Sequence, residues 1–401
     1  MNASPGALAG IKVVDLTRIL SGPYGSQILA DHGATVIKVE PPAGDETRDW
    51  GPPFRDGTAS YFVGVNRNKR SIALDLTKPE GREVLFRLLE DADVLFENFK
   101  TGQLQKWGLD YETVLKPRFP RLIYAQISGF GPDGPLGGLP GYDAAVQASS
   151  GLMSINGSPE SGPVRLGTPI VDLGTGLNAV LGICMAIIER QRSGLGQHVE
   201  CSLYDVGISL LHPQAANWFM SGEPPKLLGN SHPNICPYDQ YRTRTRPIFL
   251  AVGNDTQFRR LCDCLGVPDL PGEARFRTNR DRVANRDALN AVLQDLLLRH
   301  DGPALASRLL DLGVPVGPVQ SIPEVMEDPH TRHREMVVAI DDYRGTGIPL
   351  KLSRTPGAAR SKPPAFGADG RAILREHGLS DAEIDALTAA GIVCAERRTG
   401  R

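Results

Sequence analysis

The sequence predicts an α/β protein whose larger part is an open, mainly parallel sheet with helices on both faces. Short apolar segments typical of buried strands alternate with segments of helical period, and Gly and Pro mark the turns between them. The 44 Lys and Arg nearly balance the 46 Asp and Glu, so bulk charge indicates no nucleic-acid partner.

The first half of the chain shows this alternation most clearly. Residues 11–16, 24–32 and 34–40 read as strand, helix and strand, with Gly33 ending the helix. This β-α-β order predicts parallel strands joined by a right-handed crossover. Further elements are expected at 71–76, 94–97, 122–127 and 198–203 as strands, and at 79–90 as a helix.

The second half is expected to hold a smaller domain. Residues 177–188 predict a helix with one apolar face, formed by Leu177, Val180, Leu181, Cys184, Ile187 and Ile188. Segment 206–240, rich in Gly, Pro and Asn, is interpreted as a linker into a domain at 241–325. That domain is expected to contain helices at 287–298 and 303–312 and a strand at 313–319, and the tail a helix at 381–390 capped by Ser380.

Several function classes lack support in the sequence. No run of about 18 apolar residues predicts a membrane span, and the first residues do not resemble a leader peptide. The six scattered cysteines and the eight histidines show no metal-binding or redox spacing, so we expect a cytoplasmic protein with no metal.

Two short motifs favour a structural interpretation. Residues 129–134 match G-x-G-x-x-G after a strand, but Pro132 and Pro135 prevent the helix that a dinucleotide site requires. Ser202, with Asp205 and His198 nearby in sequence, lacks the G-x-S-x-G turn of a hydrolase nucleophile. We therefore expect a loop at the first motif and no catalytic triad at the second.

Asp172 is the candidate nucleophile. It lies between a short apolar segment and the helix expected from about Thr175, where a plain helix N-cap is the structural alternative. A carboxylate at a helix start is expected to stay ionised, because the dipole and the free N–H groups favour the anion. Gly174 and Gly176 would leave room for a bulky substrate and bare N–H groups for an oxyanion, so Asp172 could attack a thioester.

Longer motifs, in a fixed order, resemble those of the class III CoA-transferases, the CaiB/BaiF family. They are DLTR at 15–18, VIKVEPP at 36–42, GDETR at 44–48, NRNKRSIALDL at 66–76, ENF at 97–99, GYD at 141–143, GLGQHVE at 194–200 and GVPVGPV at 313–319. The resemblance extends from about residue 10 to about residue 393, nearly the whole chain.

This resemblance implies a Rossmann-like large domain made from both chain ends, 1–205 and 326–401, and an interlocked homodimer. It implies CoA as a substrate, with no permanently bound cofactor and no membrane or nucleic-acid partner. The implied CoA contacts are Arg18, Ser21, Leu74, Thr77, Asn98, Phe99, Lys100, Lys106 and Tyr142. Lys and Arg suit the CoA phosphates, and loops at strand ends suit ligands in open α/β sheets.

Within the family, residues 45–54 are most similar to the succinate–hydroxymethylglutarate CoA-transferase branch, which implies succinyl-CoA as donor and a dicarboxylate as acceptor. Such an acceptor requires a cation for its distal carboxylate. Arg48 is the first candidate, followed by Arg165 and His232. The glycine-rich loop of formyl-CoA transferase is not recognisable, which argues against formyl or oxalate substrates, and residues 367–370 read GADG where the family carries Gly-x-His-Thr.

The resulting hypothesis is a CoA-transferase that works through an aspartyl-CoA thioester on Asp172. An α-methylacyl-CoA racemase is the alternative within the family. Racemases carry Gly-His-Asp where this chain has GYD at 141–143, and Tyr142 is a poor base near neutral pH. A CoA-binding protein that kept the fold without catalysis is a third hypothesis, opposed by the presence of Asp172 and its glycines.

Overall fold

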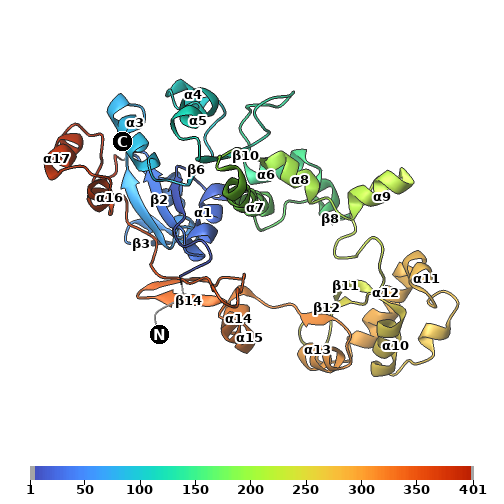
Figure 1. The fold of residues 1–401 in the computed structure, drawn as a ribbon. Helices are drawn as coiled ribbons and strands as arrows, with labels where there is room; N and C mark the ends of the chain where they lie inside the picture. Colours follow the sequence, from blue (N-terminus) through green and yellow to red (C-terminus); the bar gives the residue numbers. More distant parts are fainter. Residues whose placement is uncertain (1–4, 399–401) are drawn as a thin grey trace. The chain divides into compact units, whose positions relative to one another are not determined.

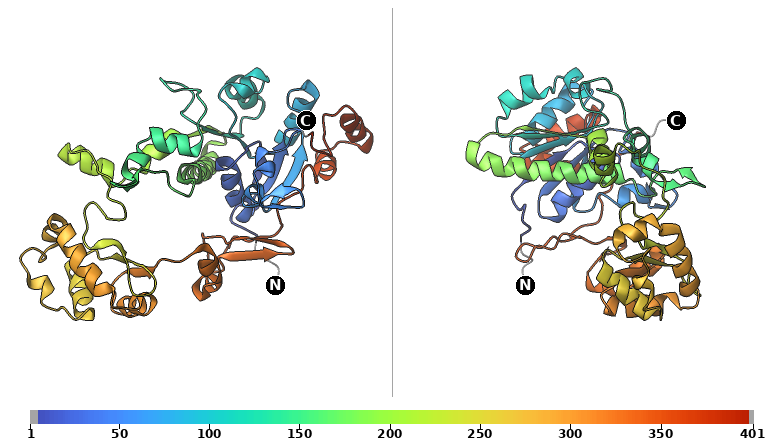
Figure 2. Two further views of the ribbon diagram at one scale, coloured as in Figure 1. Left: turned by 180° about the vertical axis from the view of Figure 1, so that it is seen from behind. Right: turned by 90° about the vertical axis from the view of Figure 1, so that its right-hand side faces the viewer.

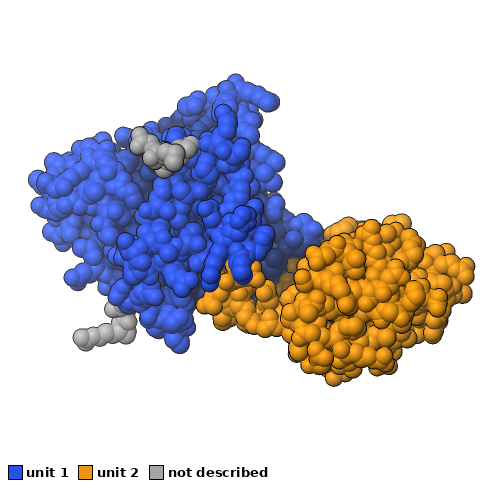
Figure 3. Space-filling model, turned by 90° about the horizontal axis from the view of Figure 1, so that it is seen from below, with its two compact units in different colours: residues 1–150, 167–210, 329–401 blue, residues 151–166, 211–328 orange. Residues whose placement is uncertain are grey.

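The structure is a computed structural model that describes residues 5–398. The chain forms two compact units, coloured separately in Figure 3. Among the described residues, unit 1 extends to residue 150, resumes at 167–210, and takes in the C-terminal part from 329. Unit 2 consists of residues 151–166 and 211–328.

These boundaries correct the predicted domains 1–205, 206–240, 241–325 and 326–401. Segment 151–166 belongs to unit 2, where the N–H of Gly229 donates to the carbonyl of Gly157 (2.8 Å). The expected linker contains the end of α8 (Leu203–Ser209), which belongs to unit 1, and all of α9 (Gln214–Ser221), which belongs to unit 2. Composition did not predict the place of segment 151–166, because that place depends on a contact between segments distant in the sequence.

Unit 1 is built on a six-stranded sheet in which every neighbouring pair is parallel. The spatial order is β5 (Lys69–Ala73), β2 (Thr35–Glu40), β1 (Lys12–Asp15), β6 (Val94–Glu97), β7 (Ile123–Ser128) and β10 (His198–Ser202). The chain adds strands outward from β1 in one direction, then crosses to β6 and adds them in the other. The order therefore reverses between β1 and β6, and open α/β sheets bind ligands at such a switch point.

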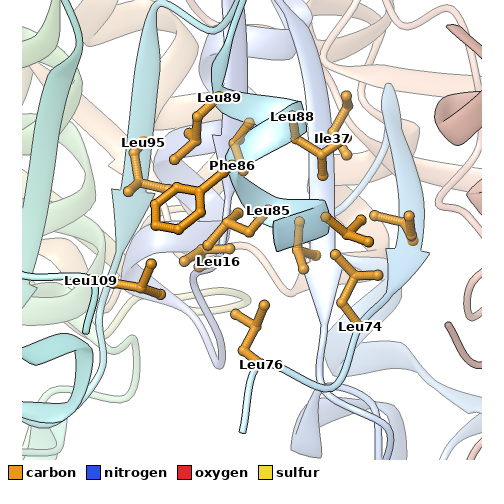
Figure 4. Close-up of a cluster of buried hydrophobic side chains, with 14 of the residues drawn as sticks. Leu16, Ile37, Leu74, Leu76, Leu85, Phe86, Leu88, Leu89, Leu95 and Leu109 are labelled. Carbon is orange, nitrogen blue, oxygen red and sulfur yellow. The ribbon is translucent and has the colours of Figure 1, made fainter. Parts of the chain in front are cut away.

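Helices cover both faces of this sheet, as expected (Figures 1 and 2). On one face α1 (Ser21–Asp31) and α7 (Ile170–Ser193) pack against each other and against strands. On the other face lie α3 (Pro79–Leu89), α16 (Gly370–Glu376) and α17 (Asp381–Ala389), whose apolar side chains belong to one buried core cluster. Figure 4 shows part of this cluster, with Leu85, Phe86 and Leu89 of α3. The core includes every second residue along the strands, for example Val14 in β1 and Leu16 just after it. Successive side chains of a strand point to opposite faces of the sheet, so alternate residues share a face.

The face that meets α1 carries buried charges under the loop that follows β1. Three ion pairs lie there, Lys38–Asp45 (2.9 Å), Arg48–Glu40 (2.7 Å) and Lys69–Asp15 (3.3 Å). Lys38 also donates to the carbonyl of Thr17 (2.8 Å), and Asp15 accepts from the Thr17 N–H (2.9 Å). These bonds hold the chain between β1 and α1, which contributes part of the site.

The C-terminal part of unit 1 returns to the edge of the sheet at β5. The N–H of Asp75 donates to Ile392 (2.9 Å), and the N–H of Cys394 donates to Ala73 (3.1 Å). Ser380 caps α17 in a capping box with Glu383, as predicted for that helix. Unit 1 is thus built from both chain ends, as the family resemblance implies.

Unit 2 has its own sheet and core. The antiparallel sheet has the order β11 (Tyr238–Tyr241), β12 (Ile248–Ala251) and β13 (Val316–Pro318). Besides α9, its helices are α10 (Asp255–Cys264), the short η4 (Leu270–Gly272), α11 (Asn279–Ala284), α12 (Arg286–Leu297), α13 (Gly302–Asp311) and α14 (Ile322–Glu327). Their apolar side chains, including Phe258, Leu293 and Leu309, form a separate buried cluster.

Short elements complete the structure. They are η1 (Glu46–Asp49), β3 (Phe54–Arg55), β4 (Thr58–Ala59), α2 (Ser60–Val63), α4 (Gln103–Lys106), η2 (Tyr111–Leu115), α5 (Lys116–Arg118), α6 (Asp143–Ser149), η3 (Leu152–Ile155), β8 (Gly157–Ser158), β9 (Gly162–Pro163), α15 (Pro329–His333), β14 (Val337–Ile340) and β15 (Tyr343–Thr346).

One helix among residues 5–398, α7, is long and apolar enough in length and composition alone to cross a membrane. The sequence analysis had found no such segment. The core helix of a globular protein has the same properties, and α7 packs against α1, β7, β10 and α8. Leu177, Leu181, Met185 and Ile188 nevertheless form a stripe on α7 that is at least half exposed in this chain.

Candidate active site

A cavity of about 220 Å³ opens at the carboxyl ends of the strands on both sides of the switch point. Its walls come from the segments that follow β1, β6, β7 and β10, together with Asp172 at the start of α7. Six of the residues predicted to contact CoA line it: Arg18, Ser21, Asn98, Phe99, Lys100 and Tyr142. The structure therefore brings the candidate nucleophile together with most of the predicted CoA site.

A second cavity, of about 320 Å³, lies at the ends of β2 and β5. Leu74 and Thr77, two further predicted CoA contacts, line it. It shares Arg18, Phe99 and Lys100 with the first cavity, so the two form neighbouring parts of one surface. Lys106 lines neither cavity and is exposed at the end of α4.

Asp172 is the third residue of α7 and is not its N-cap, which is Pro169. The carboxylate that caps this helix comes from Asp143, whose Oδ1 accepts from the N–H groups of Val171 (2.8 Å) and Asp172 (3.2 Å). Gln147 donates to the other oxygen of Asp143 (2.6 Å). The sequence analysis quoted Asp143 in a motif but did not assign it this role.

The environment of Asp172 corrects the expectation that its carboxylate is held ionised by free helix N–H groups. Burial raises the pKa of Asp172 from 3.8 to about 7, and the nearby charge of Asp143 adds to the effect. The N–H groups that would have favoured the anion are bonded to Asp143 instead. A carboxylate with a pKa near 7 is a stronger nucleophile when ionised than one at its ordinary value.

This pKa predicts a pH dependence for the candidate nucleophile. With Asp172 in that role, we expect kcat/KM to rise with pH through about 7, because attack requires the ionised carboxylate and kcat/KM reports the free enzyme. Asp143→Asn keeps an oxygen for the two N–H groups but removes the like charge. The rising limb of its pH–rate profile should therefore lie at lower pH than that of the parent enzyme. A limb that does not move would contradict the assigned effect of Asp143.

Gly174 and Gly176 do not serve the predicted purpose of making room for substrate. Both lie inside α7, where backbone N–H groups bond within the helix. A Cβ at Gly176 would lie 2.5 Å from the carbonyl oxygen of Ser21, and one at Gly174 would lie 3.2 Å from Val206. These glycines instead allow α1 and α8 to approach α7 closely.

The loop after β1 and the loop after β6, on the two sides of the switch point, are joined by hydrogen bonds. The side-chain amide of Asn98 accepts from the N–H of Arg18 and donates to its carbonyl, both at 2.7 Å. Ile19, the next residue, has φ = 71°, a left-handed conformation that is strained for a β-branched side chain. Strain of this kind persists only where the surroundings impose it, and it is common in active sites.

Glu97 positions the loop after β6. It is buried and accepts from the N–H of Phe99 (2.6 Å), the phenol of Tyr124 (2.7 Å) and the amide of Gln126 (2.6 Å). Burial raises its pKa to about 7 despite these hydrogen bonds. Glu97 thus holds the backbone that carries Asn98 and Phe99 into the cavity.

Arg18 and Tyr61 complete the surroundings of Asp172. Arg18 pairs with Glu46 (3.1 Å), lies over the ring of Phe99 (5.4 Å to its centroid), and has a buried Nε without a partner among the described residues. Burial raises the pKa of Tyr61, and the charges of Asp172 and Asp143 raise it further. No feature of the sequence could connect Tyr61 with a residue more than a hundred positions away.

Comparison with known proteins identifies the chain. The family model of CoA-transferase family III matches residues 8–370. The chain belongs to CoA-transferase family III. It is 43% identical over 381 residues to a succinate–glutarate CoA-transferase from Agrobacterium fabrum, covering 92% of this chain and 95% of that protein. It is 38% identical to an acetyl-CoA:oxalate CoA-transferase from Acetobacter aceti, covering 94% and 97%.

A solved structure is similar over nearly the same length. A CaiB/BaiF family protein from Brucella suis matches with a TM-score of 0.84 and 43% identity, covering 93% of this chain and all of that one. This protein is accordingly an acyl-CoA:carboxylate CoA-transferase of family III. These findings argue against the third hypothesis, a CoA-binding protein that kept the fold without catalysis.

In this family III chain the guanidinium of Arg48, the first predicted cation for an acceptor, is already paired. It is 2% exposed and binds Glu40 through Nε (2.8 Å) and Nη2 (2.7 Å). It also lies 3.6 Å from the centroid of the Phe62 ring. Arg48 lines neither cavity, so the structure argues against the predicted contact with substrate and gives Arg48 a structural role.

The other two predicted cations, Arg165 and His232, belong to unit 2. Arg165 is exposed and donates to the carbonyl of Leu166 (3.0 Å). Burial lowers the pKa of His232, and Arg286 lowers it further, so its imidazole is neutral at pH 7. The charge of Arg48 is bound to Glu40 and the imidazole of His232 is neutral, so neither of these two suits the predicted contact.

The weaker motifs are structural, as expected. Ser202 caps α8 by accepting from the N–H of Asp205 (3.1 Å), and His198 packs on the ring of Tyr124. Residues 129–142 form a loop with left-handed glycines at 131, 134 and 138. Within residues 5–398 no three His, Cys, Asp or Glu side chains are grouped closely enough to hold a metal ion.

Proposed function

We propose that this enzyme transfers CoA from succinyl-CoA to a dicarboxylic acid through an aspartyl-CoA thioester on Asp172. The observation that carries this proposal is the position of Asp172 in the cavity at the switch point, with a pKa raised to about 7. Two cations, Arg18 and Lys100, lie in the wall shared by both cavities.

The proposed reaction has four steps. Asp172 attacks the thioester carbonyl, and the carbon–sulfur bond breaks to give an aspartyl anhydride and CoA thiolate. The thiolate attacks the Asp172 carbonyl and displaces the donor acid, leaving an aspartyl-CoA thioester. The acceptor carboxylate then forms a new anhydride and releases the thiolate, which attacks the acceptor carbonyl and frees Asp172. A carboxylate nucleophile suits this sequence, because each intermediate is reactive enough to keep every step reversible.

The two cavities support an extended position for CoA. Its thioester would lie beside Asp172, and its remaining length would cross the shared wall toward Leu74 and Thr77. The Lys100 side chain is exposed and forms no ion pair with any residue the structure describes, so it is available to a phosphate. Arg18 carries its charge in the same wall, although it shares that charge with Glu46.

The substrates are proposed from the relatives, whose names include succinate, glutarate and oxalate. The oxalate-using relative weakens our argument against oxalate from the missing glycine-rich loop. We expect succinyl-CoA with glutarate or another C4–C6 dicarboxylate to give the new CoA ester, detected by mass spectrometry. Oxalate and a monocarboxylate of equal length serve as comparisons. Equal rates with the monocarboxylate would contradict the dicarboxylate assignment.

Arg165 is our candidate for the distal carboxylate of the acceptor. Loss of a charge-assisted contact of about 3 kcal/mol should raise KM for dicarboxylates by roughly 10²-fold in Arg165→Ala. The KM for a monocarboxylate should change little, because it lacks the distal charge. Equal increases in KM for the dicarboxylate and the monocarboxylate would show that Arg165 does not bind the distal carboxylate.

The racemase alternative is less well supported. Racemisation removes a proton from one side of a carbon and returns one to the other, so it requires two acid/base groups. No histidine is among the residues that line the cavity of Asp172, within the part of the chain the structure describes. Tyr142, at the racemase His position, is 58% exposed, and no histidine from elsewhere among the described residues takes that place in the cavity wall.

We also propose a homodimer with interlocked subunits. The exposed apolar stripe on α7, formed by Leu177, Leu181, Met185 and Ile188, supports a second copy as the partner, since such patches on monomers are usually small. Sedimentation should show a dimer, and tagged and untagged dimers should not exchange subunits under native conditions. An active monomer would contradict the assembly, and rapid exchange would contradict the interlocking.

A further inference from the structure

The first step of the proposed reaction creates an oxyanion on the thioester carbonyl, and α7 has no free donor for it. The N–H of Ile170 donates to Thr168 (2.8 Å), and those of Val171 and Asp172 donate to Asp143. The N–H of Leu173 already bonds to Pro169 (3.1 Å). The donors must therefore come from another element of the cavity.

The N-terminus of α1 offers the free hydrogen-bond donors that α7 lacks. This 11-residue helix has no side-chain cap and no acidic residue in its first turn. Its first N–H groups therefore remain without a partner inside the helix. Its first residue, Ser21, is 3% exposed, and its hydroxyl is buried without a hydrogen-bond partner among residues 5–398.

Ser21 and Asp172 line the same cavity from adjoining helices. Asp172 and Gly176 are one turn apart on the same side of α7. The close approach at Gly176, where a Cβ would lie 2.5 Å from the Ser21 carbonyl oxygen, sets the start of α1 beside that side of α7. The loop before Ser21 is held by Asn98 and includes the strained Ile19.

An unpaired buried hydroxyl destabilises a folded protein, because it has lost its hydrogen bonds to water. Such a group calls for an explanation, and a catalytic role is one when the hydroxyl belongs to the lining of an active-site cavity. We propose that Ser21 is a second catalytic residue, whose hydroxyl, together with the N–H groups at the start of α1, donates to the oxyanion formed when Asp172 attacks the thioester. This inference rests on the proposed function and replaces the predicted contact of Ser21 with CoA.

The step balances without a further reactant. An oxygen of Asp172 forms a bond to the thioester carbon, and the carbonyl π electrons move to the oxygen that Ser21 binds. When the carbonyl reforms, the carbon–sulfur bond breaks and the electron pair leaves with the CoA sulfur as thiolate. The same donors bind the oxyanion of each later tetrahedral intermediate that forms beside Ser21. The hydroxyl of Ser21 keeps its proton throughout.

Ser21→Ala tests the inference, because it removes the hydroxyl and leaves the backbone N–H groups. Loss of one preorganised donor lowers kcat by roughly 10²-fold in comparable sites. We expect that loss in kcat and in the single-turnover rate of adduct formation from succinyl-CoA. The KM for succinyl-CoA and the Kd for CoA should stay within about twofold, since the interaction forms only in the transition state.

Ser150→Ala is the matched control. Its hydroxyl is also buried and unpartnered among the described residues, but Ser150 does not line the cavity of Asp172. Both variants should have a Tm equal to or above that of the parent enzyme, because each loses an unsatisfied polar group. Only Ser21→Ala should lose activity.

Three results would overturn the inference. Adduct formation at the parent rate in Ser21→Ala would show that the hydroxyl is not used. A weaker Kd for CoA with unchanged kcat would assign Ser21 to CoA binding. A lower Tm with a uniform loss in all kinetic parameters would show a structural role. Failure of the parent enzyme itself to form an adduct at Asp172 would instead refute the proposed function.

Discussion

Replacing Asp172 by Ala should reduce CoA transfer by about 10⁴-fold or more, because it removes the carboxylate proposed to form the covalent intermediates. Asp172→Asn should lose activity to the same extent, since an amide is a poor nucleophile. Both variants should bind CoA with an unchanged Kd, because the cations of the shared wall, Arg18 and Lys100, remain. Initial rates of ester formation and calorimetric binding of CoA measure the two quantities.

The same substitution should stabilise the fold. Asp172 has a pKa of about 7 in the folded chain against 3.8 when exposed, so the folded state binds its proton more tightly. Stability is then lost as pH rises from about 4 to about 7, by up to about 4 kcal/mol above that window. Asp172→Asn removes the ionisable carboxyl group and therefore this loss of folding stability at high pH. Its gain in Tm over the parent enzyme should be larger at pH 8 than at pH 5.

A Tm gain with lost activity would distinguish a functional carboxylate from a structural one. A structural Asp172 would behave in the opposite way, with Asp172→Asn destabilised at pH 8. Near-normal turnover in purified Asp172→Ala would contradict the mechanism, whatever its stability.

Arg48→Ala should have the largest destabilising effect. Burial acts to raise the pKa of Glu40, but the hydrogen bonds and charge of Arg48, with smaller effects of Lys38 and the Asp45 N–H, outweigh it and hold that pKa below its ordinary value. Removing Arg48 leaves the Glu40 carboxylate buried without its partner, which costs roughly 3–5 kcal/mol. Chemical denaturation of unit 1, followed by Trp50 and Trp107 fluorescence, measures the change.

Arg70→Ala is the matched control for Arg48→Ala. Arg70 also binds a glutamate through two nitrogens, Glu376 at 2.6 and 2.9 Å, but in an exposed position. Its loss should cost at most about 1 kcal/mol. A stable Arg48→Ala whose KM rises only for dicarboxylates would restore the substrate role first predicted for Arg48.

Local sequence patterns were sufficient for the sheet and most of its helices. The apolar segments before Asp15 and Glu40 are strands β1 and β2, and Gly33 ends the helix between them, because buried strands and helix ends depend on near neighbours. Segment 151–166 was misplaced because its membership in unit 2 depends on a bond to Gly229. The apolar side of α7 was recognised, but the sequence alone could not show that Leu181 and Met185 remain exposed.

Three residues of the candidate site were predicted from the sequence, and all three line the cavity. Asp172 was predicted from its position before a helix, and Arg18 and Lys100 from the family resemblance. The cap on α7 was missed, because Asp143 reaches it from 28 positions earlier in the chain. Arg48 was assigned to substrate because it lies in a segment that resembles the dicarboxylate branch, whereas its pairing with Glu40 becomes apparent only in the folded chain, where both are buried.

A covalent intermediate on Asp172 is the central claim, and peptide mass spectrometry after a single turnover tests it most directly. The enzyme is incubated with succinyl-CoA in the absence of acceptor, quenched in acid, and digested. We expect a CoA adduct on the peptide that contains Asp172, removed by hydroxylamine and absent from Asp172→Ala. Turnover without any adduct, or an adduct on another residue that persists in Asp172→Ala, would contradict the claim.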